Sequence, residues 1–181
     1  APTTHWTGRP QPLNSTISID GQVFRLMGVE LAGTHPLPQL DVNVLPTRTI
    51  YRFGNEKANV VLTFLTPALP SDLDVLSRPL TWDVQSADGR PHAVRIDFNY
   101  GAQMAVEETD QAVVWDRPQM EGLVVSRVGT KDQHVLGRKG DMLRIDWGYA
   151  YLAAPSDART RLTGDGALSI NLGQVGAEKA T

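Results

Sequence analysis

The sequence contains no cysteine, and this absence excludes three kinds of chemistry at once. Without thiols, the 181-residue chain has no disulfide framework, no thiolate zinc site and no cysteine nucleophile. No apolar run approaches the roughly 18 residues that a membrane-spanning helix needs, so we expect no membrane partner. An excess of positive charge is also missing, because 17 Lys and Arg stand against 20 Asp and Glu. We therefore expect no nucleic-acid partner either.

Helix signals are scarce, whereas turn residues are abundant. The chain has 16 glycines and 12 prolines, too many for a helical bundle, and its 41% hydrophobic residues are enough for a globular core. Strand-like runs recur every ten or so residues with turn residues between them, which is typical of a β-sandwich. The sequence predicts an all-β fold, an antiparallel β-sandwich with long Pro/Gly-rich loops. We expect residues 1–181 to form a single domain.

The clearest strands flank turn residues. Asp20–Gly21 stands between the β-rich runs Ile17–Ile19 and Val23–Met27, which predicts a hairpin. The turn Ala87–Arg90 predicts a second hairpin from the strands on either side of it. The other expected strands are Val42–Leu45, Thr49–Phe53, Val60–Leu65, Thr81–Gln85, Ala93–Tyr100, Ala112–Trp115, Leu123–Val128, Leu143–Ile145, Trp147–Ala153 and Ala167–Leu172.

Two proline-containing stretches are expected to lie outside the strands. Leu31–Gln39 contains Pro36 and Pro38 and is predicted to be an exposed loop. Residues 68–79 contain two prolines, and a short helical turn is predicted at Ser71–Asp74 with Ser71 as its N-cap.

The histidines give little support for catalysis or metal binding. None of the four lies in a G-x-S-x-G turn, and no two have metal-ligand spacing. His35 and His92 are predicted to be surface residues. No glycine-rich stretch has the spacing of a phosphate-binding loop. We expect no catalytic residue, no metal site and no cofactor in this chain.

The carboxylates leave a catalytic role open as an alternative to a structural one. Asp141 and Asp146 flank the expected strand around Leu143, and Glu107, Glu108 and Asp110 form an acidic cluster. Paired carboxylates can perform glycosidase-type acid–base chemistry. A strand-end aspartate is more often a turn former or the partner of an arginine, and a solvated loop explains the acidic cluster. Structural roles are therefore favoured for Asp146 and for the acidic cluster.

The segment His5–Asn14 is polar, aromatic and stiffened by two prolines. A rigid loop of this kind would project the Trp6 indole and the Arg9 guanidinium, which suit ligand stacking or a domain interface. The alternative is that Trp6 plugs one end of the sandwich.

Five long stretches, in order along the chain, share their residues with one known family: Thr4–Asn14, Val44–Tyr51, Leu62–Pro79, Val113–Arg117 and Leu143–Tyr149. They resemble the glutaminase A family of bacteria and fungi, and the likeness covers nearly the whole chain. In that family, this region is an N-terminal β domain that precedes a larger helical domain. The family's named activity is the hydrolysis of L-glutamine to L-glutamate and ammonia.

The resemblance implies that the chain is the N-terminal fragment of a larger, secreted or periplasmic hydrolase. Its β-sandwich would be non-catalytic and would support and partly wall the active site of the parent protein. We expect Trp6, Arg9, Asp146 and Trp147 to face the helical domain or a ligand. Ala1 lies inside the family's N-terminal block, so an edge strand left unpaired there is a possible route to self-association.

A second hypothesis is a carbohydrate-binding or accessory β-sandwich of a glycoside hydrolase-like protein. It rests on the frequency of such domains ahead of helical barrels and on tryptophans that can stack on sugar rings. A freestanding glutaminase is disfavoured, because the sequence assembles no activated nucleophile.

Overall fold

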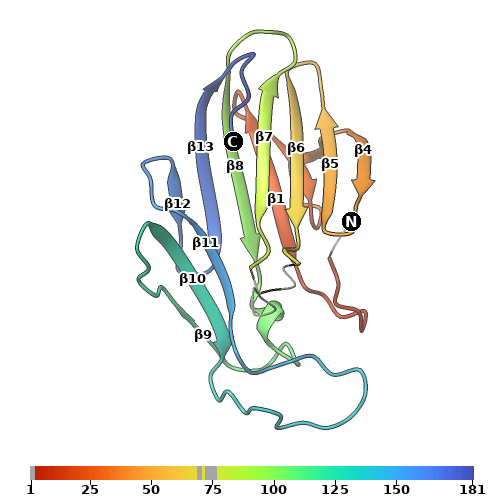
Figure 1. Cartoon of the computed structure of the whole chain (residues 1–181), viewed down its shortest axis with the longest axis vertical. Coiled ribbons are helices and arrows are strands. Elements are labelled where there is room, and N and C mark those ends of the chain that lie inside the picture. The colour runs from red at the N-terminus through yellow and green to blue at the C-terminus, as the bar shows by residue number, and fades with distance from the viewer. Residues whose placement is uncertain (1–2, 69–70, 72–76) are drawn as a thin grey trace. The chain divides into compact units, whose positions relative to one another are not determined.

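The computed structural model describes residues 3–68, 71 and 77–181, and in these ranges the chain is built from β-strands (Figure 1). The described residues include no α-helix, only the short 3₁₀ helix η1 at Ala102–Ala105. The predicted all-β fold is therefore confirmed. Most of the helical turn predicted at Ser71–Asp74 lies outside the described residues. No helix among the described residues is long and apolar enough to cross a membrane.

The strands follow one another along the chain at short intervals. They are β1 (Leu13–Ile19), β2 (Gln22–Met27), β3 (His35–Pro36), β4 (Gln39–Val44), β5 (Arg48–Gly54), β6 (Ala58–Leu65), β7 (Leu80–Ser86), β8 (His92–Tyr100), β9 (Val113–Asp116), β10 (Leu123–Thr130), β11 (Ala150–Pro155), β12 (Thr160–Leu162) and β13 (Ala167–Val175).

These strands form three sheets. A six-stranded sheet has the order β12-β13-β8-β1-β2-β3, a four-stranded sheet the order β4-β5-β6-β7, and a three-stranded sheet the order β11-β10-β9. The chain divides into two compact units. Unit 1 comprises residues 1–17, 25–33 and 96–171, and unit 2 comprises residues 18–24, 34–95 and 172–181.

The core of unit 2 follows from strand alternation. In the antiparallel pair β6–β7, Val60 lies opposite Val84 and Leu62 opposite Trp82, and all four side chains are buried. Because side chains alternate between the faces of a strand, every second residue of both strands points into the same core. The edge of β7 is paired with the C-terminal segment, where Val84 exchanges both backbone hydrogen bonds with Ala180, each of 2.8 Å.

The core of unit 1 is centred on an aromatic pair. The buried Tyr100 at the end of β8 meets Trp115 of β9 edge-on, with ring centroids 5.3 Å apart. Val128 of β10 and Ala105 of η1 complete this cluster. Gly166, which has a φ of +80°, lies so close that a Cβ there would come 2.5 Å from the Tyr100 ring. Glycine is thus required both by the backbone and by the packing.

The hairpin predicted at Ala87–Arg90 is wrong, although both of its strands exist. β7 belongs to the four-stranded sheet and β8 to the six-stranded sheet, so the turn between them passes from one sheet to the other. Alternation specifies which residues of a strand face the core, but not which neighbour the strand pairs with. The hairpin predicted at Asp20–Gly21 is confirmed, because β1 and β2 are neighbours in one sheet.

Two further expectations need correction. The stretch Leu31–Gln39 is mostly irregular, but His35–Pro36 pairs briefly as β3 and Gln39 begins β4. The prediction of an exposed loop is also wrong at Leu37, which is 2% exposed. Leu143–Ile145 forms no strand and belongs to the connection between β10 and β11. Arg144 of this segment instead forms hydrogen bonds to the N-terminal loop and to the residues at and after η1.

Candidate functional site

The N-terminal loop, residues 3–12, is closed by its own backbone. The His5 amide donates to the Arg9 carbonyl and the Gly8 amide to the His5 carbonyl, both at 2.9 Å, and Gly8 has a φ of +82°. This turn presents Trp6 at its tip, where 72% of the residue is exposed. The alternative that Trp6 plugs the sandwich is therefore wrong.

Arg9 anchors this loop to a pair of glutamates that follows η1. Its Nη1 lies 3.0 Å from Oε1 of Glu107 and 2.8 Å from Oε1 of Glu108, and it donates to the Glu107 carbonyl at 2.6 Å. The hydrogen bond to Glu108 is the main cause that raises the pKa of Arg9. One guanidinium thus holds two carboxylates and a backbone oxygen, which is the geometry of a fixed loop rather than a free surface charge.

Glu107 is 1% exposed, so the prediction of a solvated acidic loop is wrong for this residue. Its carboxylate accepts a hydrogen bond from the backbone amide of Arg144 through Oε2, in addition to the ion pair with Arg9. A buried carboxylate is tolerated only when it is paired and hydrogen-bonded, and Glu107 has both kinds of contact.

Arg144 is also buried, at 6% exposure, and its guanidinium binds backbone carbonyls. Nη1 donates to the carbonyls of Pro10 at 3.3 Å and Gln103 at 3.4 Å, and Nη2 donates to the carbonyl of Glu107. Within the described part of the chain, its Nε atom has no hydrogen-bond partner. One cation therefore joins the N-terminal loop, η1 and the long connection after β10.

Asp146 lies on the same long connection, residues 131–149, and its side chain is 12% exposed. Oδ2 accepts a hydrogen bond of 2.9 Å from Nε2 of Gln111 and lies 3.6 Å from Nε of Arg138. Oε1 of Gln111 in turn accepts the backbone amides of Glu107 at 2.7 Å and Glu108 at 2.9 Å. The network thus links Arg9 to Asp146 indirectly, through Glu107, Glu108 and Gln111.

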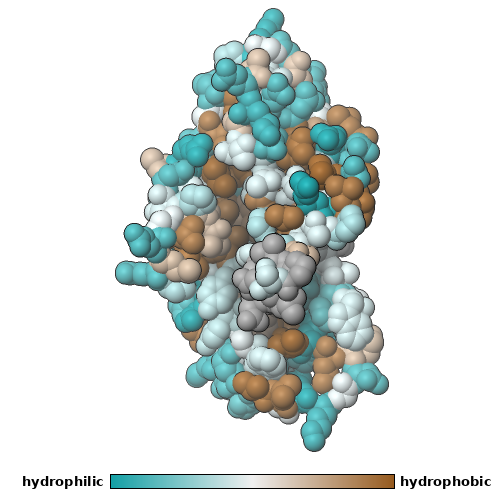
Figure 2. Space-filling model, viewed as in Figure 1, coloured by the Kyte–Doolittle hydropathy of each residue, from teal (hydrophilic) through white to brown (hydrophobic). Residues whose placement is uncertain are grey.

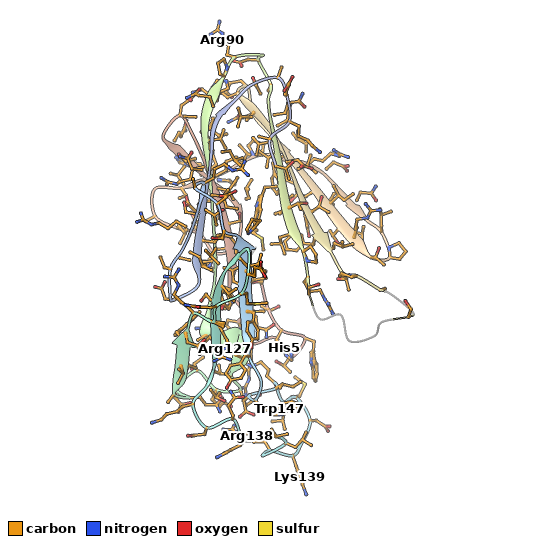
Figure 3. All side chains as sticks on the ribbon, turned by 60° about the vertical axis from the view of Figure 1, so that its left-hand side comes forward. His5, Arg90, Arg127, Arg138, Lys139 and Trp147 are labelled. Atoms are coloured by element: carbon orange, nitrogen blue, oxygen red, sulfur yellow. The ribbon has the colours of Figure 1, made fainter. Side chains whose placement is uncertain are left out.

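Trp147, the fourth predicted site residue, is partly buried next to Asp146. Figure 3 shows Trp147, Arg138 and Lys139 on the same connection, with Lys139 extending into solvent. The connection is strained, because Gln133, Leu136 and Met142 all have positive φ values, between 47° and 64°. The Gln133 side chain holds it in place by accepting from the Gly148 amide at 2.7 Å and donating to the Thr130 carbonyl at 2.8 Å. Such strain persists only where the surrounding contacts fix the backbone.

A polar pocket of about 280 Å³ opens at this network. It is lined by Gln111, Ala112, Thr130, Asp132, Gln133, His134, Gly137, Arg138 and Asp146. The Asp146 carboxylate that faces it is already engaged by an amide and a guanidinium, so the pocket is built to hold a polar group rather than to activate a nucleophile. No group of three or more His, Asp or Glu side chains in the described ranges could hold a metal ion.

Large apolar side chains stand exposed on the same two loops. They are Trp6, Val135, Leu136, Met142, Ile145 and Tyr149. Figure 2 shows hydrophobic residues at the surface of the molecule, set among hydrophilic ones. An exposed apolar group that is held in a fixed geometry and surrounded by polar residues is typical of an interaction surface.

A second surface feature lies on the three-stranded sheet. Arg127 of β10 is opposite Tyr151 of β11 and Asp116 of β9, and its Nε donates to Asp116 at 2.8 Å. The same guanidinium lies 4.3 Å from the centroid of the Tyr149 ring, and Tyr149 meets Tyr151 edge-on at 6.3 Å. Both tyrosines remain about half exposed, so this face, the tyrosine platform, presents two pre-ordered rings.

Sequence reasoning proposed Trp6, Arg9, Asp146 and Trp147 but missed Gln111 and the two buried charges of the network, Glu107 and Arg144. The sequence holds no local signal for them. Arg144 lies between the apolar residues Leu143 and Ile145 and is buried, but Arg95 lies between Val94 and Ile96 and is exposed.

The comparisons with known proteins give one match. A family model described as "Domain of unknown function (DUF5127)" matches residues 47–179, which is well over half of the chain. No curated protein and no solved structure matches. The matched region contains most of the network, including Glu107, Gln111 and Arg144, whereas Trp6 and Arg9 lie before it. The chain therefore belongs to the DUF5127 family.

Proposed function

We propose that this chain is the non-catalytic N-terminal β domain of a glutaminase A-like amidohydrolase, which converts L-glutamine to L-glutamate and ammonia. DUF5127 is the N-terminal domain of glutaminase A-like proteins, and the five sequence stretches that resemble glutaminase A agree with this. In this proposal, the domain supports the helical catalytic domain and forms part of the active-site wall.

The observation that carries the proposal is the fixed, apolar loop surface. The buried charges of Glu107 and Arg144 hold the two loops, and those loops expose Trp6 and Ile145 to solvent. Burying a charge is costly, so a network of this kind is expected where loop positions must be precise. We propose that Trp6, Arg9, Asp146 and Trp147 face the helical domain, with Trp6 as the main anchor.

The experiment compares Ile145→Glu with Val44→Glu, first in the separately produced β and helical domains and then in the full-length parent protein. Ile145 is 65% exposed on the proposed interface, and Val44 is 73% exposed on β4 of unit 2, so both variants put a charge on an exposed apolar position. We expect Ile145→Glu to weaken association between the separately produced β and helical domains at least tenfold and to lower glutamine hydrolysis. Val44→Glu should leave both unchanged. Equal effects of the two variants would contradict the proposed interface.

The absence of catalysis in this chain is tested separately. The isolated chain should release no ammonia from glutamine at any pH, because the carboxylates of the network are held by Arg9, Gln111 and Arg138. Ammonia release well above that of a Trp6→Ala/Asp146→Asn variant would show that the chain itself is catalytic.

The tyrosine platform favours a second candidate function, carbohydrate binding. Tyr149 and Tyr151 offer ring faces for the apolar side of a sugar, and Arg127 and Asp116 neutralise each other, which suits an uncharged ligand. Tryptophan fluorescence, followed during titration with a panel of neutral oligosaccharides, tests this function. Saturable binding that Tyr151→Ala abolishes and Trp6→Ala retains would favour it, and a flat response across the panel would exclude it.

A further inference from the structure

His92 is buried, with 7% of its surface exposed, so the prediction of a surface histidine is wrong. It lies at the start of β8, directly after the connection from β7. Its Nδ1 is 2.8 Å from Oδ2 of Asp20, and its Nε2 is 3.0 Å from Oδ1 of Asp88. Both ring nitrogens therefore face carboxylate oxygens.

This arrangement defines the protonation state of the ring. An ionised carboxylate only accepts hydrogen bonds, so each ring nitrogen has to donate, and only the imidazolium form has two N–H groups. A neutral ring would turn one nitrogen lone pair toward a carboxylate oxygen. The contact would then change from attractive to repulsive.

The cluster joins three turns of unit 2. Asp20 lies in the β1–β2 turn, Asp88 in the β7–β8 connection, and Lys57, whose Nζ is 3.1 Å from Asp20, in the β5–β6 turn. β1, β2 and β8 belong to the six-stranded sheet, whereas β5, β6 and β7 belong to the four-stranded sheet. The side chains therefore connect the ends of two different sheets.

Backbone contacts hold the carboxylates in position. Oδ1 of Asp20 accepts the Ala93 amide at 3.0 Å, and the Asp20 amide donates to the Ala93 carbonyl at 2.9 Å. Oδ1 of Asp88 accepts the Arg90 amide at 2.9 Å and the Ser86 hydroxyl at 3.0 Å. Asp20 itself has a φ of +51°, a strained conformation for a residue with a side chain. The two carboxylates are thus fixed whether or not the ring is charged.

We propose that His92, Asp20, Asp88 and Lys57 form a pH-gated clasp that, within unit 2, joins turns at the ends of the six-stranded and four-stranded sheets while His92 is charged. With the imidazolium present, two cations balance two carboxylates. Loss of the ring proton leaves a net negative charge and one repulsive contact, which opens the clasp. Opening exposes the neighbouring turns and the ends of the buried strands that they connect.

The direction of the pKa shifts agrees with the geometry. The hydrogen bond to Asp20, followed by that to Asp88, raises the pKa of His92. The stabilisation is complete below the pKa of an unfolded histidine, about 6.5, and is lost as the pH rises through the raised pKa of the closed clasp. Asp20 and Asp88 both have a pKa lowered to about 2, so they remain charged throughout this range.

Hydrogen exchange measured at several pH values tests the clasp, after correction for the intrinsic exchange rates. Between about pH 6.5 and the raised pKa, the opening constant of the three turns should rise about tenfold per pH unit, because one proton is released on opening. His92→Gln cannot titrate and should remove this slope, whereas the control His35→Gln, at an exposed histidine, should retain it. A wild-type slope in His92→Gln would overturn the proposal.

A second measurement begins with the wild-type protein. The ¹⁵N shifts of the His92 ring report its protonation directly, and we expect both nitrogens to be protonated at pH 6.5 with a titration midpoint above that value. Asp88→Asn removes one carboxylate and should lower this midpoint. A neutral tautomer at pH 6.5, or an unchanged midpoint in Asp88→Asn, would show that the cluster is not a clasp. Neither result bears on the proposed glutaminase role.

Discussion

Replacing Arg144 with methionine is the sharpest test of the loop network. Methionine keeps most of the side-chain volume but removes the donors to the carbonyls of Pro10, Gln103 and Glu107. Hydrogen bonds to a charged group contribute about 1.5–3 kcal/mol each, so the gross loss for the three bonds is about 4.5–9 kcal/mol. Because the methionine variant no longer buries a charge, it avoids a desolvation cost of several kcal/mol, which offsets part of this loss. We expect the free energy of unfolding to fall by about 3 kcal/mol.

Urea denaturation followed by tryptophan fluorescence measures this change. The matched control is Arg138→Met, because the Arg138 side chain is about half exposed and lies 3.6 Å from Asp146. An exposed pair at this distance contributes about 1 kcal/mol or less. A loss below about 1 kcal/mol for Arg144→Met, or equal losses for the two variants, would refute the argument that Arg144 holds the loops.

A double-mutant cycle with Arg9→Met sharpens this test. Arg9 and Arg144 both donate to the Glu107 carbonyl, so either arginine alone still satisfies it. Removing the second arginine leaves the buried carbonyl without a donor, which adds about 1–3 kcal/mol beyond the sum of the single effects. Additive losses would show that the two guanidiniums act independently.

Four further outcomes follow from the packing and the charges. Leu62→Ala, at a fully buried position of β6, should lower the free energy of unfolding by about 2–5 kcal/mol in urea denaturation. Trp6→Ala, at an exposed position, should change it by less than about 0.5 kcal/mol. Gly166→Ala should be destabilising and should weaken the near-UV circular dichroism of the Tyr100–Trp115 pair, because its Cβ would lie 2.5 Å from the Tyr100 ring. Asp20 and Asp88 have pKa values lowered to about 2, so their ionised forms stabilise the fold above about pH 4. This stability is lost as the pH falls through about 2, and urea denaturation midpoints measured at a series of pH values would detect the loss.

Much of the fold was predictable because it depends on local alternation. Ala58, Val60 and Leu62 of β6 are buried at every second position, as are Val94, Ile96, Phe98 and Tyr100 of β8, and the predicted strands match the observed ones within a few residues. The choice of partner strand is not local. The turn Ala87–Arg90 has hairpin composition, but the strands on either side of it pair in different sheets. A sandwich buries the same alternating residues whether a turn forms a hairpin within one sheet or passes to the other sheet. Composition and periodicity therefore do not distinguish these two connections.

The buried charges were less predictable, because their partners lie far away in the sequence. Glu107 meets Arg9 across 98 residues and the Arg144 amide across 37, and His92 meets Asp20 across 72. Each residue taken alone has the local sequence of a solvated loop. Even a charge set between apolar neighbours does not indicate burial, because Arg144 is buried whereas Arg95, between Val94 and Ile96, is exposed. Nothing local identifies the residue that compensates a buried charge.

The two charge clusters have different consequences for function. The cluster at Glu107 is built from two guanidiniums and backbone carbonyls, and a guanidinium remains charged at every pH at which the protein is folded. The two guanidiniums therefore keep their charge across the pH range in which His92 loses its proton, as the proposed docking surface requires. The cluster at His92 uses an imidazolium, the one cation among the side chains that loses its proton near neutral pH. If the proposed interface and clasp are both correct, raising the pH should loosen the turns of unit 2 while the affinity of the Trp6 surface for its partner stays constant.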